Sequence, residues 1–412
     1  MLTFTASTLF TPRDVISNAA MVVEHGRVVE VASCEFVPAP AKALFVDFGA
    51  HTIAPGYIDL HIHGAAGFDV MDDSPEALVA IERLLAGRGV TSYLPTTVTA
   101  PMDATLRALE RLADAIEARA ASRANALETG NAAEAGSSFP SSSLNSSFAG
   151  RARPLGIHLE GPFISHARRG VHPTEHLLPP KSEIFERLWQ AARGHIRMMT
   201  IAPELDGALE LIAYASARGV RVSLGHSDAN FETTARAISA GAGHATHTFN
   251  AMRPLGHRDP GIVGAVLTDD RVTCDFIADG IHLDPAIVKL IATAKGAERT
   301  VLITDAISAT GMPDGRYRLG SMEVDVKNGR CESGGRLAGS VLTMDRAVRN
   351  LAKFAGWGLR ESVAAASANP AAVLGDPNNK GELRTGADAD FVVLDQNGNV
   401  VRTFIRGQEA LA

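Results

Sequence analysis

The chain has 412 residues, of which 46% are hydrophobic and 21% charged, and this composition excludes intrinsic disorder of the whole chain. Its 39 basic and 46 acidic side chains give a net charge of −7, so the basic excess typical of a nucleic-acid-binding protein is absent. Three cysteines are too few and too scattered for a disulfide framework or a CxxC zinc site, and their odd number favours a reducing, cytoplasmic location.

The first 51 residues are predicted to form short strands. Met21–Val23 and Val28–Val31 flank a turn that contains glycine, which is typical of a hairpin. The first 30 residues lack a basic stretch followed by an unbroken apolar run, so we expect no secretory signal. Nowhere do 18 apolar residues follow one another, so we expect no membrane span.

The middle of the chain alternates strands with helices. Most of the strands are nearly continuous apolar runs, as expected for parallel strands covered on both faces. Eight strands with mostly helical connections are the number that closes a (β/α)8 barrel. The expected helices include Pro75–Ala86, Gly207–Ala217 and Phe231–Ala240. The expected strands are Tyr57–His61, Thr91–Leu94, Leu155–Leu159, Arg197–Ile201, Arg221–Leu224, His244–Thr246, Val272–Ile277 and Val301–Ile303.

Two segments interrupt this alternation. Residues 118–153 are rich in Ala, Ser and Asn, and Ser fills seven of the twelve positions from 136 to 147. This composition is typical of a flexible linker, so we expect a flexible insertion at 118–153. Glycine-rich turns and alternating residues between Gly311 and Gly339 predict a β-hairpin excursion on the rim of the barrel.

The end of the chain resembles its beginning, because Phe391–Leu394 and Val400–Ile405 are again predicted strands. We therefore expect an α/β protein with two domains. A TIM-like (β/α)8 barrel would comprise residues 52–385, and a small β-sandwich would be formed by residues 1–51 together with 386–412.

Polar side chains follow six of the eight predicted barrel strands, and the carboxyl ends of barrel strands meet at one rim. His61 and His63 are two residues apart, so both side chains face the same side of their strand. For any one of these residues, a structural role is an alternative to metal binding, namely a hydrogen bond in the core or a cap on a helix or loop. Their coincidence at one rim favours a metal site. The residues at these ends are His61 and His63, Glu160, His226, His247, Asp279 with His282, and Asp305.

The chemistry of such a site points to hydrolysis. A few His or carboxylate ligands that leave a coordination position open make a catalytic metal site. A bound divalent ion lowers the pKa of water to about 7 and polarises a carbonyl group. Asp305 is the natural general base and acid beside it. None of the lysines ends a strand, which argues against any assignment that needs a lysine bridge between two metals.

The motifs at these strand ends resemble those of the amidohydrolase superfamily and, within it, of the N-acetylglucosamine-6-phosphate deacetylase family. PGYIDLHIHG at 55–64 is typical of the superfamily, whereas HLEGPF at 158–163 and THTFNAM at 246–252 are specific to the deacetylases. The resemblance covers nearly the whole chain outside the Ser- and Ala-rich stretch. Thr248 departs from it, since bulkier apolar residues are usual there.

The resemblance implies a role for each matching residue. Glu160, His226 and His247 would form the main metal site. His61 and His63 would be ligands of a second site, with Glu160 bridging, so we expect one or two divalent ions, Zn or Fe. Asp305 would be the catalytic base and acid.

The resemblance also implies the contacts with substrate. His172 would polarise the amide carbonyl, and Arg258 would come from the partner subunit of a homodimer. Without the resemblance, a surface ion pair of Arg258 with Asp259 is an alternative for that residue. The residues expected at the substrate phosphate are Asn250, Ala251, Arg258 and His282.

The residues thus predict a metal-dependent hydrolase, and the resemblance implies an enzyme that removes the acetyl group from N-acetylglucosamine 6-phosphate, with a metal-bound hydroxide as nucleophile. One rival is a related hydrolase acting on N-acetylgalactosamine 6-phosphate or on a cyclic amide. The other is a non-enzymatic sugar-phosphate-binding protein, against which the complete ligand set with Asp305 argues. Nothing in the sequence separates the two sugar epimers.

Overall fold

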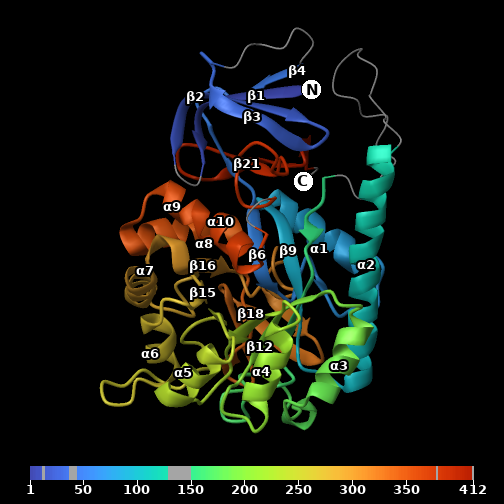
Figure 1. The fold of residues 1–412 in the computed structure, drawn as a ribbon, viewed down its shortest axis with the longest axis vertical. Helices are drawn as coiled ribbons and strands as arrows, with labels where there is room; N and C mark the ends of the chain where they lie inside the picture. Colours follow the sequence, from blue (N-terminus) through green and yellow to red (C-terminus); the bar gives the residue numbers. More distant parts are fainter. Residues whose placement is uncertain (12–13, 37–43, 129–149, 377–378, 411–412) are drawn as a thin grey trace.

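A barrel of eight parallel strands forms the centre of the structure, with helices packed around it (Figure 1). The computed structural model describes residues 1–11, 14–36, 44–128, 150–376 and 379–410. The barrel strands pair in chain order, and a two-residue strand, β10 (Arg153–Pro154), adds to β9. The barrel strands are β6 (Tyr57–Ile62), β9 (Val90–Thr97), β11 (Ile157–Glu160), β12 (Ile196–Ile201), β13 (Arg221–Leu224), β14 (His244–Ala245), β15 (Thr273–Ile277) and β16 (Thr300–Ile303).

The predicted (β/α)8 fold is confirmed, and all eight expected strands overlap with an observed one. The apolar runs arise because these strands are covered on both faces. Every residue of β6, β9 and β16 is buried.

The barrel closes between β16 and β6 through a few main-chain contacts. Ile62 and Ala306 form an isolated parallel bridge just past the end of β16. The backbone N–H of Asp305 donates to the carbonyl of His61 at 2.9 Å, and the N–H of His63 donates to the carbonyl of Ala306 at 2.8 Å. This closure brings the two histidines of β6 beside Asp305.

Helices cover the outside of the barrel, and the three that were expected are α1, α4 and α5 (Figure 1). Among the described residues, no helix combines the length and the apolar character needed to cross a membrane. The helices are α1 (Ala77–Gly87), α2 (Met102–Glu128), α3 (Ser182–Ala191), α4 (Ala208–Ser216), α5 (Phe231–Ser239), α6 (Gly261–Thr268), α7 (Pro285–Arg299), α8 (Met344–Leu351), α9 (Leu359–Ala364) and α10 (Ala368–Val373).

The expected flexible insertion at 118–153 is wrong at its beginning. Residues 118–128 belong to α2, because this stretch is rich in Ala with two Arg, and both are strong helix formers. At its other end, Arg153 pairs with Ser92 of β9. Residues 129–149, which include the Ser-rich stretch, lie outside the described residues.

A second sheet combines strands from both ends of the chain and lies at one end of the barrel in Figure 1. Its core contains four phenylalanines, and the rings of Phe391 and Phe404 stack at 4.5 Å. The division at residues 51 and 386 stays a prediction. The strands are β1 (Leu2–Phe10), β2 (Val15–Glu24), β3 (Arg27–Ser33), β4 (Leu44–Asp47), β5 (Thr52–Pro55), β21 (Phe391–Leu394), β22 (Val400–Ile405) and β23 (Gln408–Glu409).

The β-hairpin excursion predicted between Gly311 and Gly339 is larger than a hairpin, since this segment forms a four-stranded antiparallel sheet. Its apolar side chains pack against Val98 and Ile307, and the Arg336 guanidinium donates to the carbonyl of Gly170 at 3.0 Å. The excursion therefore lies against the loop that carries His172. Its strands are β17 (Gly315–Leu319), β18 (Met322–Lys327), β19 (Arg330–Ser333) and β20 (Arg336–Leu337).

Candidate active site

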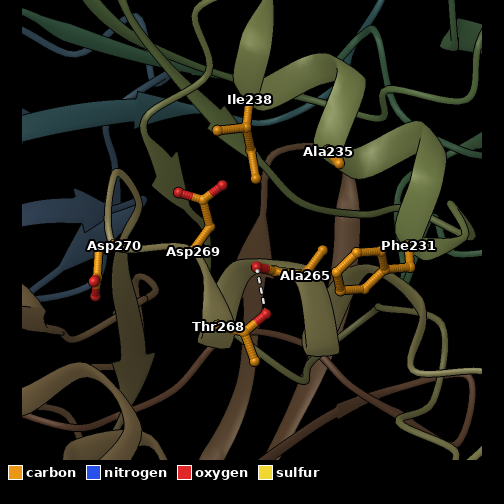
Figure 2. Close-up of a pocket in the computed structure, with 7 residues that line it drawn as sticks. All are labelled: Phe231, Ala235, Ile238, Ala265, Thr268, Asp269 and Asp270. Atoms are coloured by element: carbon orange, nitrogen blue, oxygen red, sulfur yellow. Dashed lines mark hydrogen bonds between the residues drawn. The ribbon is translucent and has the colours of Figure 1, made fainter.

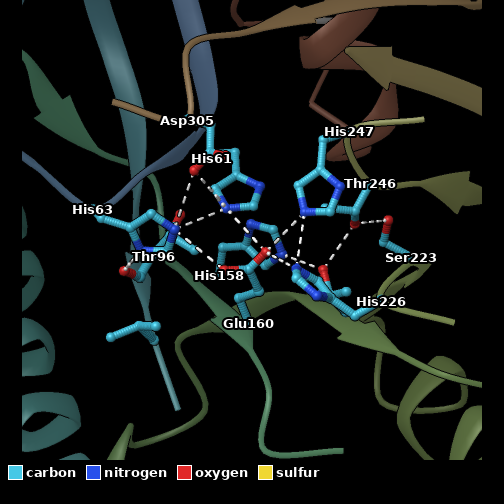
Figure 3. Close-up of polar contacts among 12 residues, drawn as sticks. His61, His63, Thr96, His158, Glu160, Ser223, His226, Thr246, His247 and Asp305 are labelled. Atoms are coloured by element: carbon cyan, nitrogen blue, oxygen red, sulfur yellow. Dashed lines mark hydrogen bonds and ion pairs between the residues drawn. The ribbon is translucent and has the colours of Figure 1, made fainter. Parts of the chain in front are cut away.

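Side chains from four other strand ends converge on Glu160 at the carboxyl end of the barrel (Figure 3). Glu160 Oε1 lies 3.1 Å from Nε2 of His226 and 3.1 Å from Nε2 of His247. Glu160 Oε2 lies 3.2 Å from Nε2 of His63. His61 and Asp305 complete the cluster. The expectation that these strand-end residues meet at one rim is thus met for His61, His63, Glu160, His226, His247 and Asp305.

The first group of potential metal ligands is Glu160, His226 and His247. The two Nε2 atoms are 3.0 Å apart, and both face the same carboxylate oxygen. Nδ1 of His226 lies 2.9 Å from the carbonyl of Arg168, which can only accept, so Nδ1 carries the proton and Nε2 of the neutral ring is a free lone pair. Two imidazole nitrogens and a carboxylate oxygen directed at one point fit a divalent ion.

The second group is His61, His63 and Glu160. The Nε2 atoms of the two histidines are 3.1 Å apart, and Nδ1 of His63 lies 2.9 Å from the carbonyl of Thr96. That bond again directs the lone pair of a neutral His63 into the site. Asp305 Oδ1 lies 3.3 Å from Nε2 of His63 and 3.6 Å from that of His61. Glu160 belongs to both groups, so the donor set suits two adjacent ions.

The protonation states follow from burial and from the central carboxylate. Burial lowers the pKa of His226 to about 4. Burial acts in the same sense on His247, but the hydrogen bond and charge of Glu160 outweigh it and raise the pKa of His247 to about 9. For Asp305, burial is outweighed by the charge of His61 and the hydrogen bond from His63, and its pKa falls to about 2. Asp305 is therefore ionised at neutral pH and able to accept a proton.

His172 lies beside Glu160. Its Nε2 is 3.5 Å from Glu160 Oε2 and its ring is buried. The backbone N–H of Thr99 donates to Nδ1 at 3.4 Å, and the Thr99 hydroxyl lies 2.8 Å from the same atom. Nδ1 is thus an acceptor, so in the neutral ring Nε2 carries the proton and is a donor toward the site.

Asn250 and Ala251 lie in the loop after β14, a few residues beyond His247. The N–H of Asn250 donates to the carbonyl of His247 at 2.8 Å, and the N–H of Ser227 donates to the carbonyl of Ala251 at 3.1 Å. Within the described residues, the buried Nδ2 of Asn250 has no hydrogen-bond partner. An unpartnered buried donor suits a ligand contact.

His282 lies in the loop after β15 and is held by Asp279. Nδ1 of His282 is 2.7 Å from Asp279 Oδ2, and both side chains are nearly buried. Burial alone would raise the pKa of Asp279, but the hydrogen bond and charge of His282 lower it. The pair fixes the orientation of the His282 ring.

Arg258 lies exposed on the loop between β14 and α6. The alternative ion pair with Asp259 is not observed, because Asp259 Oδ2 accepts from Arg253 at distances of 2.6 and 3.0 Å. A phosphate role for Arg258, donated across a dimer, stays a prediction.

A separate hollow of about 280 Å³ lies between α5 and α6, outside the barrel (Figure 2). Asp269 and Asp270 are its charged side chains, so it offers no cation to a sugar phosphate. It is lined by Phe231, Ala235, Ile238, Ala265, Thr268, Asp269 and Asp270.

Comparison with known proteins agrees with this geometry. Residues 52–410 match the amidohydrolase family. The chain is 39% identical over 373 residues to an N-acetylgalactosamine-6-phosphate deacetylase of Escherichia coli O157:H7, covering 90% of this chain and 91% of the relative. It is 36% identical over 411 residues to an N-acetylglucosamine-6-phosphate deacetylase of Bacillus subtilis, covering 98% and 95%.

A solved structure of N-acetyl-D-glucosamine-6-phosphate deacetylase from Mycobacterium smegmatis is similar to this one with a TM-score of 0.86. The two are 34% identical in sequence, and the match covers 100% of both chains. Fold and site together define a metal-dependent hydrolase built on a TIM-like barrel. The chain belongs to the amidohydrolase family.

Proposed function

We propose that the protein deacetylates N-acetylglucosamine 6-phosphate to acetate and glucosamine 6-phosphate. The observation that carries the proposal is the pair of ligand groups sharing Glu160, with ionised Asp305 beside them. The relatives that bear this activity in their names, such as those of Bacillus subtilis and Lysinibacillus sphaericus, support the substrate. A second candidate, the N-acetylgalactosamine epimer, is supported by the relative from Escherichia coli O157:H7.

The metal would be held by Glu160, His226 and His247, with His61 and His63 available to a second ion. A bound divalent ion supplies an activated water and a polarised carbonyl. Zinc and iron are the ions proposed, because imidazole and carboxylate donors suit both.

Two side chains of the protein act on the substrate directly. Asp305 transfers a proton, and His172 stabilises the charge that develops on the carbonyl oxygen. Asp305 accepts the proton of the attacking water as the new carbon–oxygen bond forms. His172 donates its Nε2–H to the carbonyl oxygen, on which negative charge develops. The carbon–nitrogen bond then breaks, and Asp305 returns the proton to the departing amine nitrogen of the sugar.

The phosphate of the substrate would be bound by Asn250, Ala251 and His282, with Arg258 from the partner in a homodimer. Charge-assisted donors of this kind favour a dianion. The protein would act in the cytoplasm.

Acetate release from the two epimeric sugar phosphates tests the proposal. The zinc-loaded protein should release acetate from N-acetylglucosamine 6-phosphate with a higher kcat/KM than from the galacto epimer. The reverse ratio would establish the second candidate. Release from neither substrate, by protein of verified metal content, would contradict both.

A further inference from the structure

Three residues of the cluster around Glu160 adopt a left-handed backbone conformation, which is disfavoured for any residue with a Cβ atom. His226 has φ 47°, His247 has φ 29° and Asp305 has φ 49°. Such conformations persist only where the surrounding structure enforces them. Each of these three residues is therefore expected to be held by a neighbouring side chain.

Behind His247 lies the fully buried carboxylate of Asp275, on β15. Its Oδ1 accepts the backbone N–H of His247 at 2.5 Å, and its Oδ2 lies 2.8 Å from Nε2 of His244. Nδ1 of His244 in turn lies 2.6 Å from the hydroxyl of Thr273. The carboxylate thus fixes the strained residue through its main chain and is itself fixed by the core.

Behind Asp305 lies the fully buried carboxylate of Asp59, on β6. Its Oδ2 accepts the hydroxyl of Thr304 at 2.6 Å, and its Oδ1 accepts the backbone N–H groups of Thr304 and His61, each at 3.3 Å. Asp59 therefore joins the two strands between which the barrel closes, just below His61 and Asp305.

Behind His226 lies Glu204, in the loop after β12. Its Oε2 accepts the hydroxyl of Ser227 at 2.7 Å, and its Oε1 accepts the backbone N–H of Asp228 at 2.6 Å. Glu204 is half-buried, unlike the other two carboxylates. It holds the two residues that follow His226.

We propose that Asp59, Glu204 and Asp275 are positioning residues that hold the left-handed turns carrying Asp305, His226 and His247. Each acts through main-chain N–H groups or a hydroxyl, and none belongs to the two ligand groups found among the described residues. Groups that orient metal ligands contribute to metal affinity as well as to activity. The inference rests on the proposed metal site.

The test is metal affinity, measured by chelator competition with Zn²⁺, together with the absorption spectrum of the Co²⁺ form. Asp275→Ala and Glu204→Ala should each weaken Zn²⁺ binding about 10- to 100-fold and change the Co²⁺ spectrum. Asp275→Asn should restore affinity to within about threefold, because the amide oxygen still accepts from the His247 N–H. Asp59→Ala should alter the Co²⁺ spectrum of the group that contains His61 and His63.

Glu82→Ala is the matched control, since Glu82 is a buried carboxylate bound by Tyr93 and Arg119, away from the ligand groups. It should lower the melting temperature and leave Zn²⁺ affinity unchanged. Glu204 is half-buried, so its variant tests the idea even where Asp275→Ala does not fold. Wild-type affinity and spectrum in Glu204→Ala and in folded Asp59 and Asp275 variants would overturn the inference. Failure of the wild-type protein to bind any divalent ion would instead overturn the metal site itself.

Discussion

At the scale of single residues, the site depends on which atom carries each proton. The carbonyl of Arg168 fixes the proton of His226 on Nδ1, and Thr99 leaves the proton of His172 on Nε2. The imidazole of His226 thus offers a lone pair at Nε2, whereas the imidazole of His172 offers a hydrogen-bond donor at Nε2. His226 suits a metal ion, and His172 suits a developing oxyanion.

Asp305→Asn should lower kcat by about 10²- to 10⁴-fold, because the amide cannot accept the proton of the attacking water. Metal content should stay nearly unchanged, since Glu160, His226 and His247 are intact. Acetate release and metal analysis on the same sample check both parts. Substantial residual turnover would contradict the role of Asp305.

Arg258→Ala should raise KM for the sugar phosphate about 10- to 100-fold, as expected for the loss of a charge-assisted hydrogen bond. The KM for unphosphorylated N-acetylglucosamine should stay the same. Arg271→Ala, which removes an exposed arginine paired with Asp269, is the control and should affect neither substrate. Equal effects of Arg258→Ala on both substrates would argue against a phosphate contact.

At the scale of elements, the sequence predicts the barrel strands and the residues that follow them, because most strands are apolar runs and six of the eight are followed by a potential ligand or a charged residue. It does not predict the three supporting carboxylates. Asp59 and Asp275 are the acidic residues of largely apolar strands, which is a usable signal, but Thr304 and His247, which they bind, are distant in sequence. Glu204 lies in a loop and carries no such signal.

Composition explains one error in detail. The Ala-rich stretch before residue 129 has the composition of a linker and also of a helix, and in the structure it continues α2 as far as Glu128. The alternative pair of Arg258 and Asp259 does not form, since Arg253, which precedes both in the chain, binds the same carboxylate. Local spacing does not determine which of two arginines folds back.

Strand β6 supplies one ligand group, whereas the turns after β13 and β14 supply the other. Replacing both His61 and His63 by Asn should therefore remove one equivalent of bound Zn²⁺ and leave the ion at Glu160, His226 and His247. Equilibrium dialysis at saturating Zn²⁺ measures the stoichiometry. His195→Asn, on the surface beside Glu117, is the control. An unchanged stoichiometry in the double variant would show that β6 holds no ion.

At the scale of the whole molecule, a buried ion cluster joins the barrel to the terminal sheet. Asp388 Oδ2 lies 2.8 Å from the guanidinium of Arg153 on β10 and 3.0 Å from Nζ of Lys380. Burial alone would raise the pKa of Asp388, but the charges of Lys380 and Arg153 outweigh it and hold the pKa well below its usual range. The cluster couples the two sheets electrostatically.

Asp388→Asn should lower the free energy of unfolding by about 3–5 kcal/mol at pH 7, since it leaves buried cations short of a partner. A carboxylate with a lowered folded-state pKa stabilises above its unfolded value of about 3.9 and loses this effect as the pH falls toward the folded value. The difference from the wild-type protein should therefore shrink below about pH 4.

Urea unfolding at pH 7, 4 and 3 measures this difference. Asp270→Asn, at an exposed carboxylate paired with Arg299, is the control and should match the wild-type protein at each pH. A difference for Asp388→Asn that stays constant from pH 7 to pH 3 would contradict the assignment.

The proposed activity depends on a metal ion held around Glu160. The most direct test is to remove metal with a chelator, to assay acetate release from N-acetylglucosamine 6-phosphate, and to add back Zn²⁺ or Fe²⁺. The metal-free protein should be inactive, and one or two equivalents of the ion should restore turnover. Full acetate release from protein shown to contain no metal would contradict the account.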